Sequence, residues 1–306
     1  MSVTVEVVGA EAAAEVYAIV HAAFAARPPL DPPAEALAET EESIAAELKQ
    51  YGGLLATREG QPVGALLFVP QDRALKLRRV GVIPEAQHHG IANHLIAAAT
   101  SYALDHGYAG LRIIARADLP ATVRFWEYSG FVIVGRDGVN LTMLHLFPQR
   151  ATIHDADAAR DLGERLAARL RAGDLLILSG DLGAGKTTTT QGIGRGLQVR
   201  GDITSPTFVI ARVHPSLVDG PPLVHVDAYR LGGMAELDDL DLDTSLDEAV
   251  TVVEWGEGVA EGLADERLEL RILRSVGDSL VEDHDPRQIV LQAVGARWLG
   301  ALDDLL

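Results

Sequence analysis

The 306-residue sequence contains no cysteine. This absence excludes disulfide bonds, thiolate nucleophiles, and zinc or iron–sulfur sites held by cysteine. No apolar run approaches the roughly 20 residues that a membrane-spanning helix needs. The N-terminal stretch "MSVTVEVVGAEAAAEVYAIV" also lacks the basic region and cleavage pattern of a signal peptide. These absences predict a cytoplasmic protein that does not act at a membrane.

Lysine is scarce, with 3 lysines against 23 arginines, and the net charge is −18. Residues 1–148 hold 16 acidic against 11 basic residues, whereas 149–306 hold 28 against 15. So acidic a second half repels phosphate backbones at long range, and we expect contact with RNA only within a larger complex. The length and the 48% hydrophobic content predict two folded domains, 1–148 and 149–306.

The first half alternates helical and strand-like patterns, which predicts a mixed α/β domain. A helix over about 10–26 precedes the proline-rich loop "RPPLDPPAEA". Further helices are expected over 90–107 and 120–130, and strands over 52–70 (a hairpin), 75–84, 110–116 and 141–147.

The second half begins with a polar junction, "FPQRATIHDADAARDL", and a helix from about 155 to 171. Strands are expected over 175–179, 208–213, 223–227, 250–255, 268–273 and 289–294. The run "ELDDLDLDTSLDEA" is interpreted as a solvated acidic face and loop, and the tail predicts one strand and a terminal helix. The fold class expected for the whole chain is α/β in two domains.

The stretch "LLILSGDLGAGKTTTT" carries the strongest chemical signal. Gly180, Gly185, Lys186 and Thr187 fit G-x4-G-K-[ST] between a strand and a helix, which is the context of a phosphate-binding P-loop. Backbone amides would cradle the phosphates, Lys186 would reach the β- and γ-phosphates, and Thr187 would ligate Mg²⁺. Thr188 is expected near the phosphates, and Thr189 and Thr190 at ordinary helix positions.

Three downstream stretches accompany this loop: "SPTF" at 205–208, "HVDAYRL" at 225–231 and "VVEWGE" at 252–257. Asp227 and Glu254 each follow an apolar strand. Because acids at the carboxyl ends of parallel strands face the phosphate site, these two are placed to handle Mg²⁺ or water. The sequence shows no second segment that builds a phosphoryl-acceptor pocket, which favours a regulatory ATPase, although a small-molecule kinase stays open.

These motifs, in this order and spacing, resemble the TsaE family, the P-loop ATPases of bacterial tRNA threonylcarbamoyladenosine (t6A) biosynthesis. The resemblance covers about 150–275 and implies ATP hydrolysis that supports TsaB- and TsaD-type partners. It implies that Thr187 and Glu254 hold Mg²⁺, that Asp227 is needed for hydrolysis, and that Trp255 lies beside the nucleotide. It also implies a base contact near 155–159, and a loop with Ser205 and Thr207 that senses the γ-phosphate or the partner. The nucleotide-binding residues expected are Asp181, Gly183, Ala184, Gly185, Lys186, Thr187, Thr188 and Trp255.

In the first half, "QHHGIA" fits [QR]-x-x-G-x-[GA] after a strand and at a helix start, where backbone amides can cradle a pyrophosphate. With "ATVRFWEYSGF" 30 residues on, residues 1–147 resemble the GNAT acetyltransferases. The resemblance implies an acetyl-CoA site: the strand residues would bind pantetheine and the turn would bind pyrophosphate. The residues concerned are Val80, Gly81, Val82, Gln87, His88, His89, Gly90, Ile91 and Ala92.

Two positions depart from the GNAT pattern. Trp126 stands where the family often has the tyrosine that protonates the leaving thiolate, and an indole N–H does not serve as an acid. Leu119 stands where an asparagine is frequent. Tyr128 is expected on a different helical face. Two hypotheses therefore stay open for this domain: an acetyltransferase of unknown acceptor, or an acetyl-CoA-binding module without catalysis. The sequence gives no general base, since a surface-turn position fits Glu85 better and a helix-face position fits His21 better.

Overall fold

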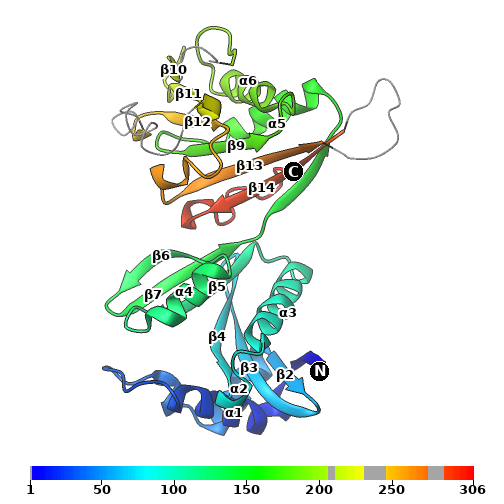
Figure 1. Ribbon diagram of the computed structural model, residues 1–306, viewed down its shortest axis with the longest axis vertical. Coiled ribbons are helices and arrows are strands. Elements are labelled where there is room, and N and C mark those ends of the chain that lie inside the picture. The colour runs from blue at the N-terminus through cyan, green and yellow to red at the C-terminus, as the bar shows by residue number, and fades with distance from the viewer. Residues whose placement is uncertain (1, 206–210, 231–245, 275–285) are drawn as a thin grey trace. The chain divides into compact units, whose positions relative to one another are not determined.

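The computed structural model describes residues 2–205, 211–230, 246–274 and 286–306 (Figure 1). The chain divides into two compact units, Met1–Leu146 and Phe147–Leu306. Within the described residues no helix is both long and apolar enough to span a bilayer.

The first unit is a seven-stranded mixed sheet with helices on both faces (Figure 1). Its strands, in spatial order, are β1 (Val3–Val8), β2 (Gly53–Arg58), β3 (Gln61–Gln71), β4 (Ala74–Val82), β5 (Gly110–Arg116), β7 (Asn140–Leu146) and β6 (Val132–Asp137). Its helices are α1 (Ala13–Ala25), α2 (Glu41–Tyr51), α3 (Ile91–Asp105) and α4 (Pro120–Tyr128). Only the pair β4–β5 is parallel.

Strand β3 lies in the centre of this core, and its apolar run follows from burial on both faces. Ala65 and Leu67 belong to the cluster formed with α1 and α2. Phe68, one residue further along, stacks on Tyr102 of α3 at a ring distance of 4.4 Å. The side chains therefore alternate between two helical layers.

Strand β4 is irregular in two ways that shape the site. Its parallel pairing with β5 ends at Lys76↔Arg112. On its other edge, Arg78 pairs with Leu67 and Gly81 pairs with Ala65, so two residues of β4 oppose one of β3. This is a β-bulge, and Arg79 within it has φ +54°. Beyond Lys76 the two strands separate, which opens space between β4 and β5.

The second unit is also a seven-stranded sheet, and α5 (Ala156–Ala167) and α6 (Lys186–Gly196) pack against each other. In spatial order the strands are β10 (Ala211–His214), β11 (Leu223–Asp227), β12 (Val250–Glu254), β9 (Leu175–Gly180), β13 (Arg267–Arg274), β14 (Arg287–Val294) and β8 (Gln149–Ile153). The four central strands β11, β12, β9 and β13 are parallel. The phosphate loop after β9 and the acids that end β11 and β12 therefore lie at the same edge of the sheet.

One strand of this unit was not expected, and one expectation for it was wrong. The junction "FPQRATIHDADAARDL" contains strand β8, which pairs antiparallel with β14 at the sheet edge. The tail after β14 forms a short 3-10 helix (Ala296–Trp298) and turns in place of an α-helix, because Gly295, Gly300 and Asp304 have positive φ. The expected strand 208–213 is described only from Ala211, and most of the acidic run lies outside the described residues.

Helices α5 and α6 touch backbone to backbone. A Cβ on Gly192 would lie 2.8 Å from Arg160 Cα and closer still to its carbonyl, and one on Gly163 would lie 2.7 Å from Ile193 N. The glycines let α6 approach α5 at a distance no side chain permits. This contact fixes the helix that begins at the phosphate loop.

Candidate functional site

The phosphate loop runs from the end of β9 to the start of α6. Gly180, Gly183 and Gly185 have φ of +140°, +75° and +112°, which L side chains rarely adopt. The first helical hydrogen bond is Thr189 N–H to Gly185 O, so the amides of the preceding helical residues point out of the helix start. Such free amides at a helix N-terminus suit an anion.

Lys186 is buried in this loop. Its ammonium donates to the carbonyls of Gly180 (2.8 Å) and Asp181 (3.0 Å) and lies 3.6 Å from the centre of the Trp255 ring. Burial lowers the pKa of Lys186, while the carboxylates of Glu254, Asp227 and Asp181 oppose that shift. The cation is thus held among loop carbonyls at the place where the motif predicts phosphate.

Glu254, at the end of β12, is the most connected side chain of the site and is only 2% exposed. Its Oε2 accepts from Thr187 Oγ1 at 2.9 Å. Its Oε1 accepts from Thr190 Oγ1 at 3.2 Å and from His225 Nε2 at 2.8 Å. The fourth threonine is therefore not an ordinary helix position as expected, and His225 had been given no role. For His225 the signal in the sequence is the alternation of side chains along the buried strand β11, which places His225 and Asp227 on the same face of the sheet.

Asp227 ends β11 directly beside Glu254 in the parallel register. Its carboxylate accepts from Ser205 Oγ at 2.8 Å and from the Tyr229 amide at 3.1 Å. Trp255, with φ +61°, has its ring 5.0 Å from that of Tyr229. Thr207 lies outside the described residues. The structure therefore brings Ser205 and Asp227 together and sets Trp255 against Lys186.

The donor set here suits Mg²⁺, which prefers hard oxygen ligands and keeps several positions for water and phosphate. Thr187 and Glu254 supply a hydroxyl and a carboxylate oxygen within 2.9 Å of each other. No group of three or more metal-ligating His, Asp or Glu side chains occurs within the described ranges. A cation here would depend on the nucleotide for its remaining ligands.

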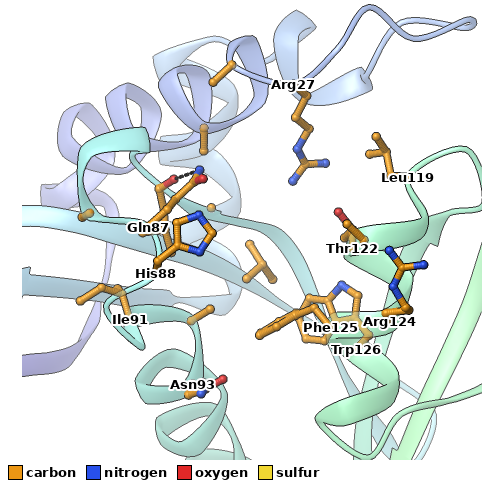
Figure 2. A pocket seen from close by; sticks show the side chains of 18 of the residues that line it. Arg27, Gln87, His88, Ile91, Asn93, Leu119, Thr122, Arg124, Phe125 and Trp126 are labelled. Atoms are coloured by element: carbon orange, nitrogen blue, oxygen red, sulfur yellow. Dashed lines mark hydrogen bonds between the residues drawn. The ribbon is translucent and has the colours of Figure 1, made fainter.

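The first unit holds a cavity of about 820 Å³ between β4, the start of α3 and α4 (Figure 2). Gly90, with φ +76°, caps α3, whose first internal bond is His94 N–H to Gly90 O. Gln87 Nε2 donates to the Val82 carbonyl at 3.2 Å. Of the nine predicted acetyl-CoA residues, eight line this cavity: Val80, Gly81, Val82, Gln87, His88, Gly90, Ile91 and Ala92. His89 does not, and its Nδ1 lies 2.7 Å from the Gln87 carbonyl.

Trp126 and Leu119 line the opposite wall of this cavity, as Figure 2 shows. The Trp126 ring packs edge-on against Phe131 at 5.0 Å. Tyr128 is 91% exposed and lies outside the lining, as the helical period predicted. Glu85 and His21 also lie outside it. A second cavity of about 220 Å³ adjoins the first, and Trp126 lines both.

Comparison with known families gives two matches. Residues 153–280 match the family described as threonylcarbamoyl adenosine biosynthesis protein TsaE. Residues 15–131 match the acetyltransferase (GNAT) family. Neither match extends into the other unit.

Curated relatives align with the second half. The TsaE protein of Streptomyces coelicolor is 64% identical over 143 residues, covering 46% of this chain and 95% of that protein. The TsaE protein of Bacillus subtilis is 38% identical over 144 residues, covering 46% of this chain and 84% of that protein.

Among solved structures, the Thermoplasma acidophilum PaiA N-acetyltransferase with coenzyme A is 16% identical, covers 48% of this chain and all of that chain, and has a TM-score of 0.44. The family matches carry the assignment. The chain belongs to the TsaE family through its second half and joins to it a GNAT-family acetyltransferase domain.

Proposed function

We propose that the second unit is a Mg²⁺-dependent ATPase that supports t6A modification of tRNA together with TsaB- and TsaD-type proteins. The observation that carries the proposal is the bond between Thr187 and Glu254, which joins the loop to the acid of the adjacent strand. Both side chains would hold Mg²⁺, which supplies charge neutralisation at the phosphates. Because the modified substrate is tRNA, we assign the activity to the cytoplasm.

Each residue of the site has a proposed part. The amides of Gly183, Ala184, Gly185, Lys186, Thr187 and Thr188 would surround the phosphates, with Asp181 at the loop entry and Trp255 beside the nucleotide. Lys186 would exchange its two carbonyl partners for phosphate oxygens, a charge-assisted bond that is stronger than a neutral one. Asp227 would orient the attacking water.

Ser205 and Thr207 would link hydrolysis to a partner. The Ser205 hydroxyl bonds Asp227 at 2.8 Å, so a change at the γ-phosphate is transmitted to this segment through one side chain. The acidic surface of the unit argues for contact with tRNA only through its protein partners.

Complementation tests this proposal. The full chain is expressed in cells depleted of their own TsaE-type ATPase, and t6A in tRNA is measured by mass spectrometry. The wild type restores t6A, Lys186→Ala does not, and Lys49→Ala, at an exposed lysine of the first unit, serves as the matched control. Restoration by Lys186→Ala would refute the assignment.

For the first unit we propose acetyl-CoA binding in the 820 Å³ cavity and transfer of the acetyl group to an amine. The pyrophosphate would lie at the amides that begin α3. Ala92→Asp places a carboxylate at this helix start. The negative charge is favourable for the helix dipole, so the fold should tolerate it, but it repels the pyrophosphate of acetyl-CoA. We expect acetyl-CoA binding, measured by calorimetry, to weaken about tenfold or more, since a lost charge-assisted bond is worth about 1.5–3 kcal/mol.

The control for this test is Ala97→Asp, at an exposed position of the same helix. Equal acetyl-CoA affinity in both variants would place the cofactor elsewhere. Thiol release from acetyl-CoA over an amine panel then separates an acetyltransferase from a module that binds without turnover.

A further inference from the structure

The second cavity of the first unit adjoins the proposed acetyl-CoA cavity. Five residues line both cavities: Arg27, Val80, Leu119, Thr122 and Trp126. A molecule in the 220 Å³ cavity can therefore contact a molecule bound in the 820 Å³ cavity. This inference rests on the proposed acetyl-CoA site.

Basic side chains reach the second cavity because of the irregularities of β4. Lys76 is the last residue of β4 paired with β5, so it stands where the strands part. Arg78, two residues on, points to the same face. The β-bulge at Arg79 turns an additional side chain to this face, which a regular strand would direct away.

Three of the basic side chains that line the cavity are satisfied by carboxylates. Arg78 Nη1 donates to both oxygens of Glu47, at 2.9 and 2.8 Å. Arg79 lies 2.6 Å from Glu39. Arg116 binds Asp118 through two nitrogens and donates to the carbonyls of Pro32 and Asp31, which fixes the proline-rich loop.

The other two cationic side chains that line the second cavity, Arg27 and Lys76, have no carboxylate partner among the described residues. Within the described part of the chain, neither forms an ion pair or a side-chain hydrogen bond. The Arg27 guanidinium lies 3.7 Å from the centre of the Phe24 ring and points into the 820 Å³ cavity (Figure 2), which shares Arg27 with the second cavity. Burial lowers the pKa of Lys76, and the charges of Arg78 and Arg112 add to that effect.

The cavity offers little negative charge to balance them. Its one acidic lining residue among the described residues is Glu35, whose side chain is 83% exposed and lies 3.5 Å from Arg79. Burial lowers the pKa of Arg27 as it does that of Lys76, and a half-buried cation without a charged partner is stabilised by an anion that enters the cavity. The missing partner is thus an anionic group of the ligand.

We propose that the second cavity binds a small primary amine that also carries a carboxylate, and that Lys76 and Arg27 recognise this carboxylate. The deprotonated amine nitrogen attacks the thioester carbonyl carbon, so a C–N bond forms and the C–S bond breaks. The electron pair leaves with the CoA sulfur, which takes a proton from solvent, while the nitrogen releases one to solvent. Polycationic amines are excluded because the cationic wall repels them.

Acetyl transfer by the full chain is measured as CoA thiol release with a thiol reagent, which meets no protein background because the chain has no cysteine. The probes are 4-aminobutanoate and 5-aminopentanoate, each against its uncharged amide, and spermidine. We expect kcat/KM to be about tenfold or more higher for each acid than for its amide. In Lys76→Met we expect kcat/KM for each acid to fall to about that of its amide, whereas Lys49→Met, the exposed control, keeps the preference for the acid.

A binding measurement decides the matter if turnover is slow. N-acetyl-4-aminobutanoate and its amide are titrated by calorimetry into the chain saturated with CoA. Tighter binding of the acid, lost in Lys76→Met, supports the proposal. Equal or weaker binding of the acid, or a preference for spermidine, overturns it. If acetyl-CoA itself does not bind, it is the proposed function of this unit that fails.

Discussion

His225 Nε2 lies 2.8 Å from Glu254 Oε1, and both side chains are buried. Because a carboxylate only accepts, the imidazole donates this bond. Together with the Thr190 hydroxyl, it occupies Oε1 and leaves Oε2 to Thr187. The histidine therefore sets the orientation of the carboxylate that we propose as a Mg²⁺ ligand.

Replacing His225 tests this positioning role. His225→Leu leaves Oε1 without its shorter bond, and we expect the Mg²⁺ concentration for half-maximal ATPase activity to rise about tenfold or more, as for other residues that orient metal ligands. His225→Gln keeps an N–H donor, so its Mg²⁺ requirement should stay close to that of the wild type. Nucleotide affinity without Mg²⁺ is the control, since it should not change. An unaltered Mg²⁺ requirement in His225→Leu would assign His225 to the core alone.

The motifs in the sequence identified this site, but they did not identify the two side chains that hold Glu254 in place, His225 and Thr190. The phosphate loop and the two strand-end acids follow from spacing, because parallel strands end at one edge. The bond of Thr190 to Glu254 depends on the distance between α6 and β12, and the bond of His225 to Glu254 depends on the pairing of β11 with β12, so motif spacing alone gives neither bond. Strand β8 was missed for a similar reason: a five-residue polar edge strand is defined by its partner β14, not by its own composition.

The β-bulge of β4 likewise has no local signature. "LKLRRVGV" predicts a strand, but the shift that turns Arg79 toward the second cavity arises from pairing with β3. Eight of the nine predicted residues within Val80–Val82 and Gln87–Ala92 line the cavity, all but His89, because the strand and the helix-start motif are continuous in sequence. Arg27 and Lys76 come together from elements 49 positions apart, and only the fold reveals them.

Gly192→Ala is expected to have two opposing effects on the stability of the second unit. In an isolated helix the change gains about 1 kcal/mol of stability. In α6 the new methyl group would collide with the backbone of Arg160, and overpacking of this kind costs about 1–3 kcal/mol. We expect the clash to dominate and the second unit to lose stability in urea unfolding.

Fluorescence isolates that unit when the measurement is made in a Trp126→Phe background, because the remaining tryptophans, 255 and 298, both belong to it. Gly220→Ala is the matched control: its nearest atoms would lie 3.5 Å away and its φ is not left-handed. A stabilised Gly192→Ala protein would show that α5 and α6 can separate freely.

His214 should make the second unit sensitive to mild acid. Burial lowers the pKa of His214 below its ordinary 6.5, and the Arg200 carbonyl only partly opposes this. In the window between the lowered value and 6.5, the unfolded chain binds a proton that the folded chain does not. Stability is therefore full above 6.5 and falls as the pH drops through this window.

Urea midpoints at pH 7.5 and 5.5 measure this loss. His214→Asn, which retains a polar group but does not titrate, should reduce the difference between the two midpoints. The exposed His154→Asn is the control and should retain the wild-type difference. If both variants behave alike, the acid sensitivity arises elsewhere.

Trp126 lines both cavities at the position where a tyrosine would protonate the leaving thiolate. An indole N–H is not an acid at ordinary pH, so solvent or another residue must supply this proton. We expect Trp126→Phe to keep kcat for acetyl transfer within about threefold, because removal of a true general acid costs about 100-fold or more. The pH profile of kcat should have the same shape in both proteins, with thermal unfolding confirming that the smaller ring is tolerated against Phe131. A fall of about 100-fold in folded Trp126→Phe would instead make the indole N–H part of the transfer step.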